Sequence, residues 1–267
     1  MKLPWKRTKR TPTPKSPNDQ MTLTEHLAEL RMRIIRAALA VMIGFVVVLA
    51  FYSPILRVLK QPFQDICESA KKFHCDGTLN YFGPLQGFST RIQLSSYGGV
   101  LIGLPVILWQ LWRFIVPGLH EKEKRYAVPF IVSSVFLFVL GGAIAFWTLP
   151  KALEFLFDFA GSGTQPVLGV AEYVRLVALM IFAFGIGLEF PILLVFLMLA
   201  RVMSYKALLR QWRYAVVGIV VLAAVITPSG DPISLAALSV PMLVSYFVAA
   251  LVGRSIYKRR EASASAE

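Results

Sequence analysis

Charged side chains are scarce in this chain of 267 residues, where they make up 16% of the sequence against about 25% in soluble domains. Histidine and cysteine are scarcer still, at three and two residues. All the histidines lie outside the long apolar runs, and the sequence contains neither a P-loop nor an HExxH motif. An enzyme acting inside a membrane would need a nucleophile with its base, or metal ligands, within those runs. We therefore predict no enzymatic activity, no cofactor and no metal ion.

Hydrophobic residues make up 56% of the chain and gather in long runs. Hydropathy indicates spans at about 34–52, 90–116, 126–149, 173–200, 214–226 and 233–252. The fifth run is short, since its thirteen residues give about 20 Å of helix against a hydrocarbon thickness of about 30 Å. The pattern predicts an all-α, polytopic membrane protein with six transmembrane helices, in a membrane domain over residues 21–257.

Lysine and arginine are distributed unevenly around these spans. Most of the 28 fall before the first span, after the second and fourth, and after the last, while the cations of the other loops are matched by acids. The positive-inside rule therefore predicts that both termini are cytoplasmic, and the net charge of +13 needs no nucleic acid to explain it. Residues 1–20 are basic and proline-rich, which is typical of a disordered tail and not of a cleavable signal peptide. Residues 258–267 form a second cytoplasmic tail.

A single charged residue, Glu189, lies between positions 176 and 200. At bilayer depth an ionised side chain costs about 2.5–3.5 kcal/mol or more, so its presence needs a reason. It is either a carboxyl group that hydrogen-bonds a neighbouring helix and stabilises the bundle, or a polar group facing a cavity filled by water or a partner. A proton-coupled small-molecule transporter would also use Glu189 as a proton site, although the first and last three spans show no inverted repeat.

The two cysteines, Cys67 and Cys75, both fall in the first outer loop. In a bacterium that compartment is oxidising enough to permit a short disulfide bridge. Together with His74 they also have the composition of an incomplete metal site. The bridge is the stronger of the two interpretations, and neither makes these residues the centre of the chemistry.

The segment just before the first span has a helical pattern of its own. Thr22 and Glu25 have the spacing of a capping box, and leucines at 23, 27 and 30 recur at helical spacing. The segment therefore predicts a helix whose apolar stripe lies on the membrane or on a partner. Glu29 and Arg33 stand four residues apart, the spacing of an ion pair worth about 0.2–0.5 kcal/mol.

Four separated motifs, in order along the chain, resemble those of one protein family. They are HLAELR at 26–31, PVILWQLWRFIVPGLHEKEKR at 105–125, FGIGLEFP at 184–191 and TPSGDP at 227–232. Together they resemble TatC, the C subunit of the twin-arginine protein translocase, and the resemblance covers about residues 24–257. The first motif alone would be a weak signal, whereas four in the right order and topology are specific.

The resemblance implies a receptor for signal peptides that carry paired arginines, in a machine that exports folded proteins using the proton-motive force. By position, Glu123 in the first cytoplasmic loop and Glu29 in the N-terminal segment recognise the arginine pair. Three further residues support them: Arg31, Phe114 and Arg125. A local carboxylate is physically required, because the basic cytoplasmic face would repel a cationic peptide and a guanidinium needs an acceptor for its forked donors. Glu121 competes with Glu123 for this role, since it has the spacing to pair with Arg125 instead.

The resemblance also implies where the protein acts and with what. Glu189 matches the family's intramembrane acid, which faces a concave wall of the six helices. The implied location is the bacterial cytoplasmic membrane, as a multi-pass protein in contact with lipid. The implied partners are single-span subunits of the TatA and TatB type, the signal peptides of folded cargo, and further copies of the chain in the receptor complex.

The edge formed by the fifth and sixth spans is the predicted docking site for the single-span partners. A short fifth span must be met by a thinned bilayer or by partner helices. The polar candidates for docking are Thr227, Asp231 and Ser234. Two departures from the family pattern bear on them: the last outer turn is one residue longer than its tightest version, and Leu235 stands where some members carry a polar side chain. Gly99 and Gly103 form a GxxxG pattern that permits close helix contact.

Overall fold

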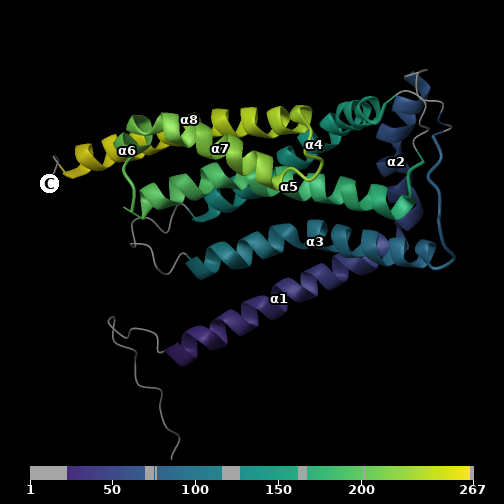
Figure 1. The fold of residues 1–267 in the computed structure, drawn as a ribbon. Coiled ribbons are helices and arrows are strands. Elements are labelled where there is room, and N and C mark those ends of the chain that lie inside the picture. The colour runs from purple at the N-terminus through teal and green to yellow at the C-terminus, as the bar shows by residue number, and fades with distance from the viewer. Residues whose placement is uncertain are drawn as a thin grey trace, which may run out of the picture.

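The computed structural model describes residues 23–69, 75, 77–115, 127–161, 167–200 and 202–264, and this part of the chain is almost entirely helical (Figure 1). The helices are α1 (Leu23–Ala50), α2 (Tyr52–Ser69), α3 (Gln86–Ile115), α4 (Ala127–Phe159), α5 (Val170–Leu199), α6 (Tyr205–Arg210), α7 (Trp212–Ile226) and α8 (Pro232–Ala264). Extended pairing in the described residues is limited to one isolated bridge between Asn80 and Gly169.

Six of these helices correspond to the predicted spans. Five are long and apolar enough to cross a membrane, at Leu27–Ala50, Gln86–Phe114, Val128–Phe159, Val170–Leu199 and Pro232–Tyr257. The shorter apolar helix, Trp212–Ile226, is the predicted short fifth span. The expectation of an all-α, polytopic fold with six transmembrane helices is therefore confirmed.

The N-terminal amphipathic segment is not a separate helix, because α1 runs without a break from Leu23 into the first span. Thr22, the tail 1–20, and the loop that carries Glu121, Glu123 and Arg125 lie outside the described residues. At the other end of the chain, α8 continues to Ala264, so the predicted tail begins as a continuation of this helix. The start of α1 and the end of α8 lie at the same end of the bundle (Figure 1).

The helix α5 occupies the centre of the bundle and packs against α3, α4, α7 and α8. Many of its large side chains are fully buried, among them Tyr173, Met180, Phe184 and Leu188. A transmembrane helix surrounded by others must pack by shape, because lipid is as apolar as a leucine side chain. Glu189 therefore lies on the helix that has the least contact with lipid.

The first helix has a different environment, since α1 packs mainly on α3 and leaves much of its surface exposed (Figure 1). The two helices meet at glycines. A Cβ atom on Gly44 would lie 2.7 Å from the carbonyl oxygen of Gly99, and one on Gly103 would lie 3.0 Å from a methyl carbon of Val41. The GxxxG pattern therefore does form a close helix contact, and any side chain at its centre would push the helices apart.

The amphipathic helix α2 lies across the end of the bundle opposite the start of α1 (Figure 1). It buries Tyr52, Leu56, Phe63 and Ile66 on one side. The ring centroid of Phe63 lies 5.9 Å from that of Tyr173, whose hydroxyl donates to the Leu59 carbonyl oxygen at 2.7 Å. These contacts attach α2 to the beginning of α5.

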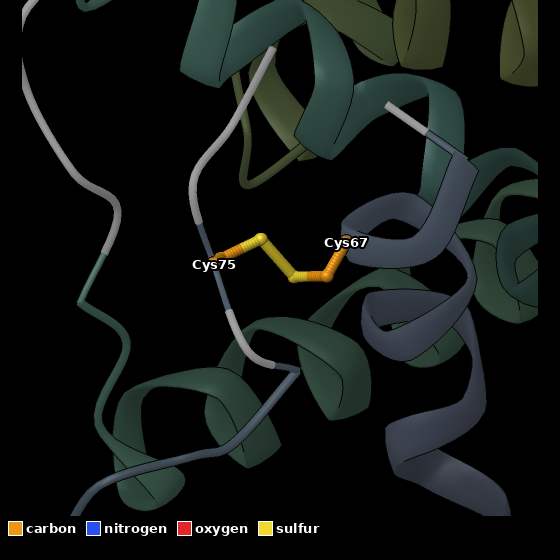
Figure 2. Close-up of a disulfide and its surroundings, with 2 residues drawn as sticks. All are labelled: Cys67 and Cys75. Carbon is orange, nitrogen blue, oxygen red and sulfur yellow. A yellow bond between two sulfur atoms is a disulfide. The ribbon is translucent and has the colours of Figure 1, made fainter. Parts of the chain in front are cut away.

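Cys67, near the end of α2, is bonded to Cys75, with 5.4 Å between their Cα atoms (Figure 2). The chain that follows pairs with the start of α5: the Asn80 amide donates to the Leu168 carbonyl oxygen at 2.9 Å, and the Val170 amide donates to the Asn80 carbonyl oxygen at 3.0 Å. In the structure the two sulfurs are bonded to each other, which favours the bridge over the metal site. The described residues contain no group of three potential metal ligands.

Candidate functional site

Arg33 joins α1 to the last turn of α3. Its side chain is 10% exposed, and its Nη1 donates to the Gln110 carbonyl oxygen at 3.1 Å. Nη2 donates to Oε1 of Glu29, one turn earlier on α1. The guanidinium carbon lies 5.7 Å from the centroid of the Phe114 ring, within the range of a cation–π contact. We call Glu29, Arg33, Gln110 and Phe114 the Arg33 cluster.

This cluster brings together two of the predicted peptide-binding residues, Glu29 and Phe114, which are far apart in sequence. Arg31 lies between Glu29 and Arg33 in sequence, on the opposite face of α1, and is exposed. Glu123 and Arg125 belong to the segment outside the described residues, so their placement relative to the cluster stays a prediction. The ion pair between Glu29 and Arg33 is present as its spacing indicates.

The cluster also contains buried polar atoms with unused hydrogen-bonding capacity. Nε of Arg33 and the side-chain Oε1 of Gln110 have no hydrogen-bond partner among the described residues. One is a donor and the other an acceptor, and a buried polar atom left unpaired costs about 1–3 kcal/mol. Sequence analysis missed the contacts of Arg33 with α3, because only its pairing with Glu29 has a local spacing signal.

Glu189 lies at the centre of a second cluster, formed by α3, α4 and α5. The Ser134 hydroxyl lies near its carboxyl group, and Nε1 of Trp112 donates to the Ser134 hydroxyl oxygen at 3.2 Å. The Glu189 oxygen Oε1 is buried and has no hydrogen-bond partner among the described residues. We call Trp112, Ser134 and Glu189 the Glu189 cluster.

Apolar side chains surround the Glu189 cluster. The Trp112 ring lies 5.0 Å from that of Phe130 and 5.4 Å from that of Phe196, measured between centroids. Ile131 and Ile192 pack against the same tryptophan. This shell limits access of water, so the polar atoms inside depend on one another for hydrogen bonds. Ser134 and Trp112 were not predicted as site residues; a serine within an apolar run was the available signal.

The two clusters share the last turn of α3. Gln110 and Phe114 are four residues apart and lie on the face toward α1, whereas Trp112, between them in sequence, contacts α4 and α5. Two residues of helix correspond to about 200° of rotation, which places these side chains on opposite faces. One helical turn therefore contacts both candidate sites.

The predicted docking residues form the tight turn between α7 and α8. The Thr227 hydroxyl donates to the Ala223 carbonyl oxygen at 2.7 Å. Asp231 precedes Pro232 and accepts a hydrogen bond from the Ser234 amide at 2.7 Å, as a helix N-cap does. The Ser229 hydroxyl donates to the other Asp231 oxygen. Thr227, Asp231 and Ser234 are all buried, and the Ser234 hydroxyl has no hydrogen-bond partner among the described residues.

The outer face of α7 presents a row of exposed apolar side chains at helical spacing. Tyr214, Val217, Val221 and Val225 are 82%, 63%, 56% and 79% exposed. Successive members are three or four residues apart, so they lie on one face of the helix. An apolar row of this kind suits contact with lipid or with another apolar helix.

Comparison with known proteins identifies the family of this chain. The family model described as Sec-independent protein translocase protein (TatC) matches residues 25–241. The chain belongs to the TatC family. The TatC of Frankia casuarinae is 40% identical, with 94% of this chain and 71% of that protein covered. The TatC of Xylanimonas cellulosilytica is 35% identical, with 91% and 86% covered.

Solved TatC structures share the fold. The crystal structure of a twin arginine translocase receptor, TatC, in DDM matches with a TM-score of 0.69 at 34% identity, covering 86% of this chain and 99% of that one. A second TatC crystal structure gives a TM-score of 0.67 at 33% identity. As a TatC protein, the chain is a multi-pass protein of the bacterial cytoplasmic membrane and a component of Sec-independent protein translocation. The TatC family is a family of translocase components and not of enzymes.

Proposed function

We propose that this TatC protein is the receptor and core subunit of a twin-arginine translocase. It binds twin-arginine signal peptides at the end of the bundle where α1 begins, which we assign to the cytoplasm. With single-span partners of the TatA and TatB type, and with further copies of itself, it exports folded proteins using the proton-motive force. The observation that carries this proposal is the Arg33 cluster, and the receptor description of the related crystal structure agrees with it.

The Arg33 cluster already binds one guanidinium with the chemistry that a second one requires. A carboxylate, a backbone carbonyl and an aromatic face surround Arg33. A carboxylate can accept about four hydrogen bonds, and the side-chain oxygen of Gln110 on α3 is a further acceptor without a hydrogen-bond partner among the described residues. An arginine of the signal peptide therefore has acceptors and a ring edge within reach, with Glu123 and Arg125 of the neighbouring loop completing the site.

The same geometry favours arginine over lysine in the peptide. A guanidinium is planar, donates in a fixed fork and stacks on rings, whereas an ammonium is a compact and strongly hydrated point charge. A lysine would keep the attraction to Glu29 and lose the forked hydrogen bonds and the stacking. The proposed site therefore distinguishes two peptides of equal charge.

Inside the membrane, we assign Glu189 to the recognition of a partner helix or a signal-peptide helix. Its carboxyl group lies on the central helix at bilayer depth, with one oxygen not yet hydrogen-bonded. This arrangement fits a polar contact with an entering helix better than a purely structural bond. Membership of a protein translocase family argues against the alternative, a proton-coupled small-molecule transporter.

The partner subunits dock, in this proposal, along α7 and α8. The fifteen residues of α7 give about 22 Å of helix, less than the hydrocarbon thickness of about 30 Å, and its exposed valine row faces outward. The buried Thr227, Asp231 and Ser234 hold the turn above this row. Their contribution to docking then comes mainly from fixing the angle between α7 and α8.

The receptor proposal is tested by comparing how the purified full-length protein binds two signal peptides that differ only in their arginine pair. A labelled signal peptide with two arginines should bind, and its version with two lysines should bind at least about tenfold more weakly, the loss expected for one charge-assisted hydrogen bond. Glu154→Ala, which removes an exposed acid from the distant end of α4, is the matched control and should bind like the unchanged protein. Equal affinity for the two peptides would contradict the receptor proposal.

A further inference from the structure

The first part of α1 is placed against the bundle by a charged residue. Arg33 is 8% exposed, whereas every other residue from Leu27 to Ile43 is half-buried or exposed. Arginine is among the residues that are least often buried, and a buried charge is normally paired and hydrogen-bonded. The position of this part of α1 relative to α3 therefore depends on what the Arg33 side chain binds.

The guanidinium of Arg33 contacts both helices at once. Nη1 donates to the Gln110 carbonyl oxygen of α3 at 3.1 Å, and Nη2 donates to Oε1 of Glu29 on α1. The guanidinium carbon lies 5.7 Å from the centroid of the Phe114 ring. A guanidinium is planar and its donors keep fixed angles, so a bond at one nitrogen restricts where the group bonded at the other can lie. Glu29 is thus held relative to α3 through Arg33.

The ion pair between Glu29 and Arg33 would not have this effect by itself. Both residues belong to α1, so their pairing joins one turn of a helix to the next. The bond to the Gln110 carbonyl oxygen, 77 residues away in sequence, turns the pair into a link between two helices.

An arginine that already pairs with Glu29 is also a potential competitor of the peptide arginine. The structure favours sharing over competition, because Arg33 would have to break its bond to Gln110 and leave the Phe114 ring in order to swing away. A carboxylate accepts about four hydrogen bonds, and Nη2 of Arg33 uses one of them. A resident and an incoming guanidinium therefore share the acid.

We propose that Arg33 is a positioning residue for recognition of an arginine of the signal peptide. It fixes the Glu29 carboxylate relative to the Phe114 ring, and this acid and ring together select a guanidinium over an ammonium. Arg33 acts through Glu29 and not by contact with the peptide. This inference rests on the receptor function proposed for the Arg33 cluster.

Peptide binding by the full-length protein tests the positioning role. The Kd values of a twin-arginine peptide and of its twin-lysine version are compared for Arg33→Gln and Arg33→Lys. The matched control is Arg36→Gln, which removes the same charge from an exposed position three residues further along α1.

Arg33→Gln should raise the Kd of the arginine peptide by up to about tenfold, the loss expected for one charge-assisted hydrogen bond. The lysine peptide should change less, so the ratio of the two Kd values should fall. Arg33→Lys should be intermediate, because it keeps the charge and loses the fork. Arg36→Gln should leave the ratio unchanged. In a Glu29→Ala background, Arg33→Gln should add little further loss, because Arg33 acts through Glu29.

A distance measurement tests the position of α1 without any peptide. Spin labels are attached at Leu27→Cys and Leu251→Cys, two exposed positions, while the native cysteines are bonded to each other and do not react. Pulsed electron paramagnetic resonance should show a broader distribution of distances in Arg33→Gln and an unchanged one in Arg36→Gln. A role in stability alone would lower the temperature of thermal unfolding without changing the Kd ratio or this distribution.

Unchanged affinity for the arginine peptide in folded Arg33→Gln would overturn the proposal, and tighter binding would overturn it in favour of competition. Losses that simply add in the Glu29→Ala background would also overturn it. If Arg33→Gln does not fold, an unchanged Kd ratio in Arg33→Lys has the same consequence. The receptor proposal fails separately, if the unchanged protein binds both peptides equally. The distance measurement then still decides whether Arg33 fixes the start of α1.

Discussion

Removal of the Glu29 carboxylate should weaken binding of a twin-arginine peptide to a measurable degree. In the structure this carboxylate is 30% exposed and pairs with Arg33. A hydrogen bond to a charged group is worth about 1.5–3 kcal/mol, which corresponds to about 10- to 150-fold in affinity. Partial exposure to water favours the lower end, so we expect Glu29→Ala to raise the Kd by about tenfold.

The amide variant separates charge from hydrogen bonding. Glu29→Gln keeps one acceptor oxygen and loses the negative charge, so the remaining bond is worth about 0.5–1.5 kcal/mol. The affinity of this variant should lie between those of the unchanged protein and of Glu29→Ala. Fluorescence anisotropy of a labelled peptide, at one fixed ionic strength, measures all three, because the attraction is screened over about 10 Å at 0.1 M salt.

A double-mutant cycle identifies the group that Glu29 contacts. If Glu29 binds the arginines directly, the loss on changing both peptide arginines to lysine should be smaller in Glu29→Ala than in the unchanged protein, by at least about 0.5 kcal/mol. Thermal unfolding must show that the variant is folded, since Arg33 loses a partner. Full affinity in the folded Glu29→Ala protein, or losses that simply add, would refute the placement of the arginine site at the Arg33 cluster.

Four further predictions concern other parts of the molecule. Glu123→Ala should raise the Kd of the same peptide by a similar factor in the anisotropy assay. Unchanged binding would remove this residue from the site. Glu189→Ala should accumulate normally in the membrane and lose transport of a folded reporter. Glu189→Gln keeps an acceptor and gains a donor, so it should retain much of this transport. Normal transport by the alanine variant would favour a structural role. Mass spectrometry of unreduced protein from native membranes should find Cys67 joined to Cys75, and replacement of both by serine should leave peptide binding intact; two free thiols would reject the bridge. Asp231→Ala removes an N-cap worth about 0.5–2 kcal/mol, so its thermal unfolding should fall to lower temperature, and an unchanged transition would show that the cap contributes little.

The transmembrane helices could be predicted from the sequence because hydropathy is a local property. Each span is a continuous apolar run, and the ion pair of Glu29 with Arg33 needs only its spacing of four residues. The helix α2 could not be found in this way. Its buried residues are interrupted by charged and polar ones, so the helix has no long apolar run.

The contacts that build the two clusters depend on how helices cross, which no local pattern encodes. Arg33 meets the Gln110 carbonyl oxygen across 77 residues of sequence. Trp112 meets Ser134 only because α3 and α4 pack side by side at that height. The family motifs pointed to Glu29, Phe114 and Glu189 as individual residues, whereas the contacts of Arg33 with α3, and the places of Gln110 and Ser134, emerge only in three dimensions.

The close glycine contact between α1 and α3 lets a small change in the angle between the two helices move the start of α1 by a large distance, as the end of a lever moves. Glu29 lies fifteen residues from Gly44, a distance of about 22 Å along the helix. A rotation of about 10° at the glycines would therefore move Glu29 by about 4 Å, more than the length of a hydrogen bond of about 3 Å. Because most of α1 faces lipid, its tilt responds to the thickness of the bilayer. If Glu29 binds the signal peptide as proposed, the membrane itself helps to set how closely this carboxylate approaches the peptide arginine.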